Sequence, residues 1–215
     1  MRYLKQKIDR FIIKLVQNYG PHELIVLGKT YIITKNVFNP KFYFTSQFMA
    51  EHISVTSKDD VLDMGTGSGI QAITAGQKAH KVIGIDINPE AVHCAMENIK
   101  YNGLENVITI YKGDLFSPLT LENKFDVILF TPPYMEGPVK CIFDHALNDP
   151  NKSLVNRFFK EARNYLKPSG YVQMVYSSLA DSQRVLKIAS DLGWRYKIMF
   201  EKMIRFEKLF IYKFN

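Results

Sequence analysis

The sequence predicts an α/β protein with a doubly wound, seven-stranded, mostly parallel sheet, helices on both faces and a small N-terminal α+β appendage. Three observations predict this fold. From residue 61 onward, short apolar runs alternate with segments of helical periodicity. A glycine-rich turn follows the first run, and several later runs end at an acidic or polar residue. Because ligands bind at the carboxyl ends of parallel strands, those polar residues are candidate site residues.

The first 40 residues have a different pattern from the rest. Residues 3–19 carry apolar side chains at helical spacing, and Gly20-Pro21 ends that pattern. Residues 24–27 and 29–34, separated by Gly28, are typical of a two-stranded hairpin. We therefore expect residues 1–40 to form an accessory helix plus hairpin and residues 41–215 to form the main domain. The accessory segment is either a lid or substrate cap, or merely a cover for one edge of the sheet.

A glycine-rich turn joins the first strand of the main domain to a helix. Three glycines alternate after apolar residues 61–62: Gly65, Gly67 and Gly69. Glycine lets the backbone turn sharply and lets a ligand approach without a Cβ in the way. Residues 67–72 also fit a dinucleotide fingerprint. Asp63, just before the loop, would repel a pyrophosphate but could pair with an ammonium group, which favours a zwitterionic ligand without phosphate.

The next two predicted strands each lead to an aspartate. Residues 82–85 end at Asp86, and an acidic residue there can accept hydrogen bonds from both ribose hydroxyls. Asn88 follows as a plausible helix cap. Residues 107–110 precede Asp114, which could accept a hydrogen bond from an adenine amino group. An aspartate of this kind, taken alone, is more often a cap or a surface carboxylate. The shared position of these residues after consecutive strands is what indicates a ligand site.

The fourth apolar run, residues 127–130, stops at Thr131-Pro132-Pro133-Tyr134. Two consecutive prolines cannot continue a central strand, because neither has an N–H to donate to the ladder. This rigid TPPY loop would aim Thr131 and Tyr134 into the ligand crevice. The alternative is a strand-end turn with no further role.

The remaining elements complete the predicted sheet. Thr45 or Ser46 is expected to cap a helix that runs through residue 53 and to reach the ligand. The later elements are expected to be a helix over 154–166, a turn over 166–170, a strand over 171–175, a helix over 185–192, and an antiparallel pair of strands at 197–200 and 209–214.

Composition indicates an intracellular globular protein. Hydrophobic residues make up 47% of the chain and charged residues 23%, which is ordinary for a globule. No apolar run approaches the ~20 residues of a membrane span, so no membrane partner is expected. Cys94 and Cys141 show no disulfide pattern, which suggests a reducing, cytoplasmic setting. The histidines show no metal-ligand spacing, and nothing indicates the oligomeric state.

Positive charge is concentrated at the two ends of the chain. Residues 1–45 hold eight Lys/Arg against two Asp/Glu, and residues 195–215 hold six against two, within a net charge of +7. Four aromatic residues interleave with Lys35 and Lys41: Phe38, Phe42, Tyr43 and Phe44. This pattern is typical of a nucleic-acid or ribosomal partner. It is equally typical of a lysine-rich solvated surface.

Together these motifs resemble the class I S-adenosylmethionine-dependent methyltransferases. The resemblance covers about residues 38–215 and includes the late segment 166–175. More narrowly, DMGTGSG with a strand-end PPY is similar to the HemK-like protein-glutamine methyltransferases. It is also similar to the wider small-domain methyltransferases, which include ribosomal RNA guanine and adenine amino methylases.

The resemblance implies a Rossmann-like methyltransferase fold and the cofactor S-adenosyl-L-methionine, with residues 41–215 as the catalytic domain. The glycines would pass under the methionine part of the cofactor, Asp63 would lie near its ammonium group, and Asp86 and Asp114 would bind its ribose and adenine. The implied cofactor-binding set also includes Thr45, Thr66, Ile87, Leu115 and Thr131. The implied catalytic residues are Thr131, Pro132, Pro133 and Tyr134, which would hold the nitrogen of a protein glutamine or an RNA base.

This chain departs from the family at Thr131, where the family usually has asparagine. A threonine hydroxyl is shorter and can donate as well as accept. The Asp144–Leu147 segment resembles the family's D-x-A-L but lacks the glycine pair that usually follows. Alternative functions are therefore a small-molecule or oxygen-directed methyltransferase, an NAD-dependent oxidoreductase, or an inactive RNA-binding module. For a hydroxyl nucleophile, His145 would be the candidate general base; otherwise it is an exposed loop residue.

Overall fold

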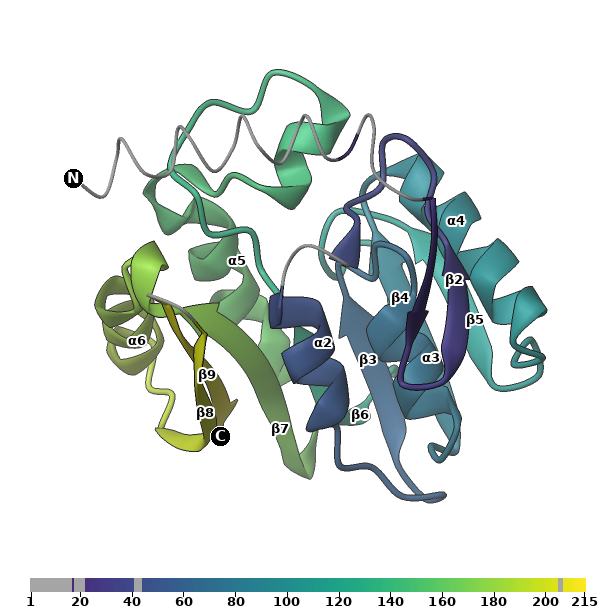
Figure 1. The fold of residues 1–215 in the computed structure, drawn as a ribbon. Helices are drawn as coiled ribbons and strands as arrows, with labels where there is room; N and C mark the ends of the chain where they lie inside the picture. The colour runs from purple at the N-terminus through teal and green to yellow at the C-terminus, as the bar shows by residue number, and fades with distance from the viewer. Residues whose placement is uncertain (1–16, 18–21, 41–43, 205–206) are drawn as a thin grey trace.

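The computed structural model describes residues 17, 22–40, 44–204 and 207–215. They form a two-stranded hairpin and a seven-stranded sheet with the strand order β5-β4-β3-β6-β7-β9-β8 (Figure 1). The strands are β1 (Glu23–Val26), β2 (Lys29–Ile32), β3 (Asp60–Met64), β4 (Lys81–Asp86), β5 (Ile108–Lys112), β6 (Phe125–Phe130), β7 (Leu166–Ser177), β8 (Tyr196–Ile204) and β9 (Glu207–Phe214). The α-helices are α2 (Phe44–Glu51), α3 (Ile70–Gly76), α4 (Pro89–Tyr101), α5 (Ser153–Ala162) and α6 (Ser182–Asp191).

The order of the strands creates a crevice at the middle of the sheet. Strand β3 pairs in parallel with both β4 and β6. The chain runs outward from β3 through β4 to β5, and then returns to the other side of β3 as β6. The carboxyl ends of β3 and β6 therefore bound a topological switch point, where ligands of open α/β sheets bind. The predicted glycine loop and TPPY loop meet there.

Within the described seven-stranded sheet, β9 alone runs against the common strand direction, pairing antiparallel with both β7 and β8. The prediction of seven mostly parallel strands closed by an antiparallel pair is confirmed.

Two apolar cores flank the sheet. On one face, α2, α3 and α4 bury residues such as Met49, Ile73 and Cys94 against the sheet. On the other face, α5 and α6 bury Phe158, Val185 and an aromatic group around Trp194. Alternate residues of each central strand enter opposite cores, as in β3, where Val61 lies in the first and Leu62 in the second. None of the described helices is long and apolar enough to cross a membrane.

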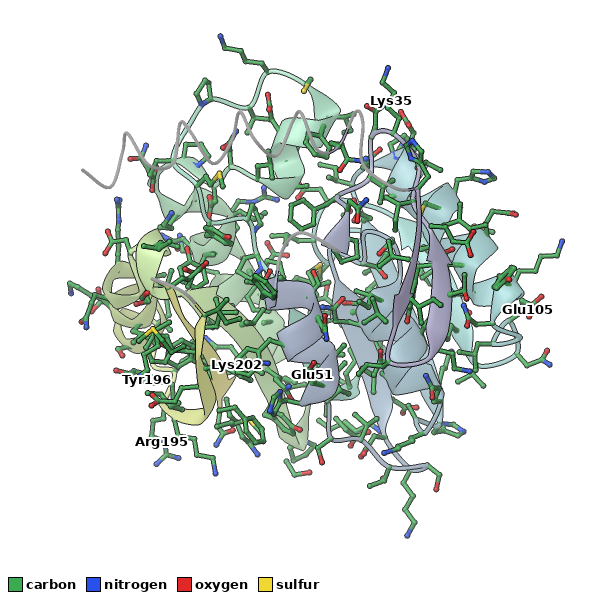
Figure 2. The ribbon with its side chains drawn as sticks, viewed as in Figure 1. Lys35, Glu51, Glu105, Arg195, Tyr196 and Lys202 are labelled. Atoms are coloured by element: carbon green, nitrogen blue, oxygen red, sulfur yellow. The ribbon has the colours of Figure 1, made fainter. Side chains whose placement is uncertain are left out.

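The outer strand β8 is tied to the helical layer. Lys202 on β8 lies 3.6 Å from Glu51 at the end of α2, while Tyr196 and Arg195 lie at the other end of the strand (Figure 2). The ring of Phe200 contacts His52 at a centroid distance of 4.2 Å. These contacts anchor the carboxyl end of α2 to β8. The first turn of α2 lies at its other end, toward the switch point.

The hairpin β1–β2 packs against α4. The Asn98 side chain accepts a hydrogen bond from the amide of Ile32 (2.8 Å) and donates one to its carbonyl (2.9 Å), while Asn102 donates to the Thr30 carbonyl (3.0 Å). The hairpin is therefore present as expected. The helix expected over 3–19 lies outside the described residues except for Gln17. The boundary at residue 40 and the lid role stay predictions.

Two local predictions were wrong. Helix α2 begins at Phe44, so Thr45 and Ser46 lie in its first turn rather than at its cap, and both are buried. Residues 166–170 do not form a free turn, because they belong to β7. The pairing with β6 shifts there from Phe125–Leu166 to Val127–Tyr171. The extra residues on β7 form a bulge that carries Lys167.

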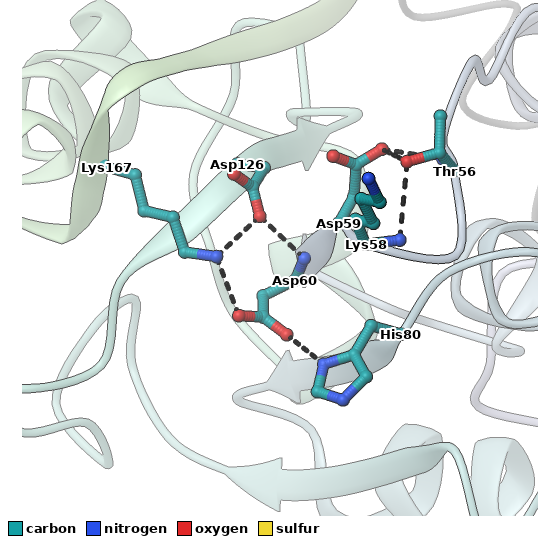
Figure 3. A network of polar contacts seen from close by, with 7 residues as sticks. All are labelled: Thr56, Lys58, Asp59, Asp60, His80, Asp126 and Lys167. Carbon is teal, nitrogen blue, oxygen red and sulfur yellow. Dashed lines mark hydrogen bonds and ion pairs between the residues drawn. The ribbon is translucent and has the colours of Figure 1, made fainter.

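Lys167 joins the amino ends of three strands. Its Nζ lies 2.8 Å from Asp60 Oδ2 and 2.7 Å from Asp126 Oδ2, and the Asp60 amide also donates to Asp126 (2.8 Å) (Figure 3). His80 Nδ1 lies 2.9 Å from Asp60 Oδ1. We call Asp60, His80, Asp126 and Lys167 the amino-end cluster. It lies at the end of the sheet opposite the switch point, so it can stabilise the sheet without touching a ligand.

Candidate active site

A cavity of about 310 Å³ opens at the carboxyl ends of the parallel strands. Its size is within the range of small-molecule sites. Most of the predicted site residues line it: Thr45, Gly65, Thr66, Gly67, Asp86, Ile87, Asp114, Leu115, Thr131, Pro132, Pro133 and Tyr134. Asp63 and Gly69 do not line it. Five segments that are far apart in the sequence thus converge on one cavity.

The glycine loop forms an open cradle on the floor of this cavity. The amides of Gly65 and Thr66 donate to the Ile85 carbonyl (2.8 and 3.0 Å), which ties the loop to β4. Gly65 has φ of 70°, and a Cβ there would meet nothing within 4 Å, so the space above it is open to a ligand. At Gly69, by contrast, a Cβ would lie 3.4 Å from the Ala95 side chain. Gly65 thus leaves room for a ligand, whereas Gly69 allows α3 and α4 to approach.

Asp63 lies beneath the cradle and holds it. It is only 3% exposed, and its Oδ2 accepts hydrogen bonds from Thr66 Oγ1 (2.7 Å) and the Ala72 amide (3.0 Å). Burial, together with the nearby charge of Asp86, raises the pKa of Asp63 to about 7, although the two hydrogen bonds act to lower it. Asp63 therefore fixes the glycine loop from below. Its pairing with a cofactor ammonium group stays a prediction.

Asp86 presents its carboxylate at the cavity wall. Its Oδ2 accepts from the Gly67 amide (2.9 Å) and its Oδ1 from the Asn88 amide (2.9 Å). Burial raises the pKa of Asp86, and the hydrogen bonds and the charge of His145 oppose that rise. Asn88 caps α4 through the Glu90 amide, as predicted (3.0 Å). Because a carboxylate already binds the Gly67 amide, this loop is a poor cradle for a pyrophosphate.

Asp114 lies in the cavity wall beside Arg157, which the sequence analysis did not single out. Its Oδ2 lies 2.7 Å from Arg157 on α5, with both side chains about half exposed. An ion pair this exposed adds little stability, roughly 0–1 kcal/mol. Leu115, next along the chain, is buried with φ of 50° and forms part of the same wall. The Asp114 carboxylate thus remains accessible to a ligand.

The TPPY loop contributes a hydroxyl that lacks a protein partner. Thr131 Oγ1 is shielded from water and has no hydrogen bond to any residue that the structure describes. A buried polar atom in this condition costs about 1–3 kcal/mol, so its retention beside a cavity indicates a ligand contact. Tyr134 packs edge-on against Tyr176 at a centroid distance of 6.1 Å. Its carbonyl accepts a hydrogen bond from Lys152 (3.1 Å).

Residues 135–149, which we call the outer loop, close one side of the cavity. The Met135 amide donates to the Leu147 carbonyl (2.9 Å) and the Asp149 amide to the Met135 carbonyl (3.0 Å), so the two ends of the loop run side by side. His145 lines the cavity from this loop. Its charge acts on Asp86 across the cavity.

Gln17 supports the opposite wall, and sequence reasoning missed it. Its amide nitrogen donates to the carbonyls of Lys35 (2.9 Å) and Val37 (2.6 Å), and its oxygen accepts from the Asn39 amide (3.2 Å). Residues 36–38 line the cavity, so Gln17 shapes the site from outside it. A single glutamine within a helical pattern carries no sequence signal of this role.

The residues present fit S-adenosylmethionine. The cradle is open above Gly65, the Asp86 carboxylate can take ribose hydroxyls, and the Thr131 hydroxyl is unpartnered among the described residues. The sheet order and this cavity together define the fold and binding site of a class I methyltransferase.

The family model described as "Methyltransferase small domain" matches residues 30–192. The chain therefore belongs to the methyltransferase small domain family and is an S-adenosylmethionine-dependent enzyme.

Relatives with assigned names agree on methyl transfer. A putative protein N5-glutamine methyltransferase of Methanocaldococcus jannaschii is 37% identical over 166 residues, which cover 74% of this chain and 82% of the relative. A release factor glutamine methyltransferase of Fusobacterium nucleatum is 31% identical, covering 66% of this chain and 47% of the relative. The chain thus spans most of the archaeal relative and about half of the bacterial one.

Solved structures confirm the fold. The T. thermophilus 16S rRNA N2 G1207 methyltransferase, in complex with AdoMet and guanosine, matches with a TM-score of 0.67 and 19% identity over 88% of this chain and 48% of that one. The predicted fold class, cofactor and enzyme class are thus confirmed, and the oxidoreductase alternative is discarded.

Proposed function

We propose that this enzyme methylates the side-chain amide nitrogen of a glutamine in a translation-related protein. The observation that carries the proposal is the Thr131 hydroxyl at the head of the TPPY loop, which is buried and has no hydrogen-bond partner among the described residues. The named relatives support the substrate class, since one is a putative protein N5-glutamine methyltransferase and another a release factor glutamine methyltransferase.

The residues of the TPPY loop suit an amide nucleophile. An amide nitrogen is a weak nucleophile because its lone pair is shared with the carbonyl. Hydrogen bonds from its two N–H groups to the Thr131 hydroxyl and the Pro132 carbonyl would turn the lone pair out of that conjugation. Tyr134 can stack on the planar amide. The nitrogen–carbon bond would form as the sulfur–carbon bond of the methyl donor breaks, and the surplus proton would pass from the nitrogen to water.

S-adenosylmethionine supplies an already activated methyl group when bound. The protein therefore needs chiefly to align the acceptor nitrogen, and alignment of this kind is worth on the order of 7–11 kcal/mol in favourable cases. Thr131 accepts one hydrogen bond while its own hydroxyl hydrogen is free to donate to the amide oxygen or another group. His145 is not required as a base in this chemistry, because the methylated nitrogen is acidic enough to lose its proton to water.

The test is transfer of labelled methyl to purified release factors and ribosomal proteins, beside total RNA. We expect protease-sensitive label on a glutamine of a protein. Thr131→Val, which keeps the shape and removes the hydroxyl, should lower kcat/KM for transfer about tenfold while still binding S-adenosylhomocysteine. Label in a metabolite pool alone would overturn the proposal and support the small-molecule alternative.

A second candidate is the exocyclic amine of an RNA base. It is favoured by the basic ends of the chain, where residues 195–215 hold six Lys/Arg against two Asp/Glu. A relative named ribosomal RNA small subunit methyltransferase C, from Alcanivorax borkumensis, is 30% identical over 54% of this chain. Ribonuclease-sensitive label in the same assay would select this candidate.

A further inference from the structure

Behind the TPPY loop lies a lysine that neither the motifs nor the cofactor site explains. The Lys152 side chain is 1% exposed, and its Nζ lies 3.1 Å from the Tyr134 carbonyl oxygen and 2.9 Å from Glu136 Oε1. Lysine is almost never fully buried unless it is paired, because its ammonium group loses the hydration that water provides. An apolar side chain would fill this position without that loss.

The backbone also departs from its preferred conformation to place Lys152 there. Asn151 and Lys152 both have φ of 57°, in the left-handed region that non-glycine residues seldom adopt. Glu136 supports both residues, since its Oε2 accepts from the Asn151 amide (3.0 Å) while its Oε1 meets the Lys152 ammonium. Strained backbone and buried charge at one point indicate a task beyond packing.

The task follows from the atom that Lys152 binds. Tyr134 is the last residue of the TPPY loop, and the outer loop begins directly after it. The two ends of the outer loop meet at Met135, through the amide of Asp149 and the carbonyl of Leu147. Lys152 follows the outer loop and reaches back to the Tyr134 carbonyl, so it ties the far end of the outer loop to the point where the TPPY loop ends.

We propose that Lys152 is a positioning residue whose ammonium group holds the Tyr134 carbonyl, and thereby fixes the TPPY loop in the arrangement that aligns the acceptor group. Glu136 balances the charge of Lys152 and holds the turn that delivers it. This inference rests on the proposed function, in which the TPPY loop holds the acceptor group. Lys152 does not line the cavity, so it would act on a bound acceptor through Tyr134.

The experiment uses the full chain with Lys152→Ala and the size-matched Lys152→Met. The control is Lys187→Met, which removes an exposed lysine paired with Asp191 on α6. Three quantities are measured for each: affinity for S-adenosylhomocysteine, exchange rates of the Met135 and Asp149 amides, and kcat and KM for methyl transfer. Lys152→Ala is also assayed with propylammonium, which replaces the missing atoms, and with propan-1-ol, which fills the same space without charge.

We expect both Lys152 variants to bind S-adenosylhomocysteine within about twofold of the original, with a kcat that falls about tenfold at little change in KM. The Met135 and Asp149 amides should exchange faster. Propylammonium should restore kcat to Lys152→Ala, and propan-1-ol should not. Equal rescue by propan-1-ol would mean that the ammonium charge is not needed, and an unchanged kcat in Lys152→Met would mean that only packing matters. Either result would overturn the proposal.

The amide-exchange measurement separates this proposal from the proposed function. If the unmodified enzyme transfers methyl to none of the offered substrates, the proposed function fails by itself. Exchange at Met135 and Asp149 then still decides about Lys152: rates equal to those of Lys187→Met overturn the positioning role, and faster rates rescued by propylammonium support it.

Discussion

The two ends of the central sheet treat their carboxylates in opposite ways. At the carboxyl ends of the strands, Asp63 is buried among neutral donors, and burial raises its pKa to about 7. At the amino ends, burial would also raise the pKa of Asp60, but hydrogen bonds from Lys167 and His80 outweigh it and lower the pKa.

The carboxyl ends also place Asp86 and Asp114 at a cavity that a ligand can enter, whereas the charges at the amino ends are paired within the protein. One sheet can thus place stabilising contacts at one end of its strands and ligand-binding residues at the other, because the amino-end cluster and the cavity share no side chain. Four predictions test that separation.

The largest effect should come from Asp86→Ala. The change removes the acceptor of the Gly67 amide and the carboxylate available to ribose. We expect S-adenosylhomocysteine to bind about 100-fold more weakly, which corresponds to about 2.7 kcal/mol. Calorimetric titration measures it, with Asp126→Asn at the opposite end as the control. Equal losses in the two variants would refute the separation.

The next effect concerns pH and Asp63. Because the folded pKa is raised from 3.8 to about 7, the protonated form is favoured by folding. Its contribution to stability is full below the unfolded pKa and is lost as pH rises through the folded one. Between pH 5 and 7 the original protein should thus lose about 2 kcal/mol relative to Asp63→Asn, by denaturant titration. A constant difference across this range would show that Asp63 titrates normally.

Thr131→Val should have a smaller effect, which lowers the rate of methyl transfer without weakening cofactor binding. The valine keeps the shape and removes the unpartnered hydroxyl, so one hydrogen bond to the acceptor is lost. We expect kcat/KM to fall about tenfold, with stability equal or slightly higher because a buried unsatisfied atom disappears. Thr131→Asn is the matched variant and should retain transfer. A loss of cofactor affinity in Thr131→Val would place the hydroxyl against the cofactor instead.

The smallest effect should come from Lys167→Met at the amino-end cluster. It leaves Asp60 and Asp126 facing each other without their shared cation, and should cost roughly 1 kcal/mol of stability near neutral pH. The cost should persist down to the unfolded pKa of 3.8 and shrink as pH falls below it toward about 3, since the Asp60 carboxylate, whose folded pKa is lowered, contributes only while it is ionised. Thermal melts at the two pH values measure this. A change in cofactor affinity would contradict the separation of the two ends.

The fold and most of the cavity could be predicted from sequence because their signals are local. Gly65, Gly67 and the TPPY loop are short patterns in which each residue's conformational preference matches its position. Lys152 and Gln17 could not be predicted, because their roles depend on partners at residues 134–136 and 35–39 that only the tertiary fold brings close. Asp63 was placed correctly beside the loop, but its burial beneath the loop was not visible in the sequence.

The position of β9 has a consequence for synthesis of the chain. Residues 207–214 lie between β7 and β8, so β8 leaves the ribosome before the strand that joins it to the sheet. Until then, β7 presents an unpaired edge flanked by apolar side chains such as Val172 and Met174, which neighbouring chains can extend. Chains that end near residue 204 should therefore aggregate or recruit chaperones, and extension through Phe214, the last residue of β9, should end that vulnerability.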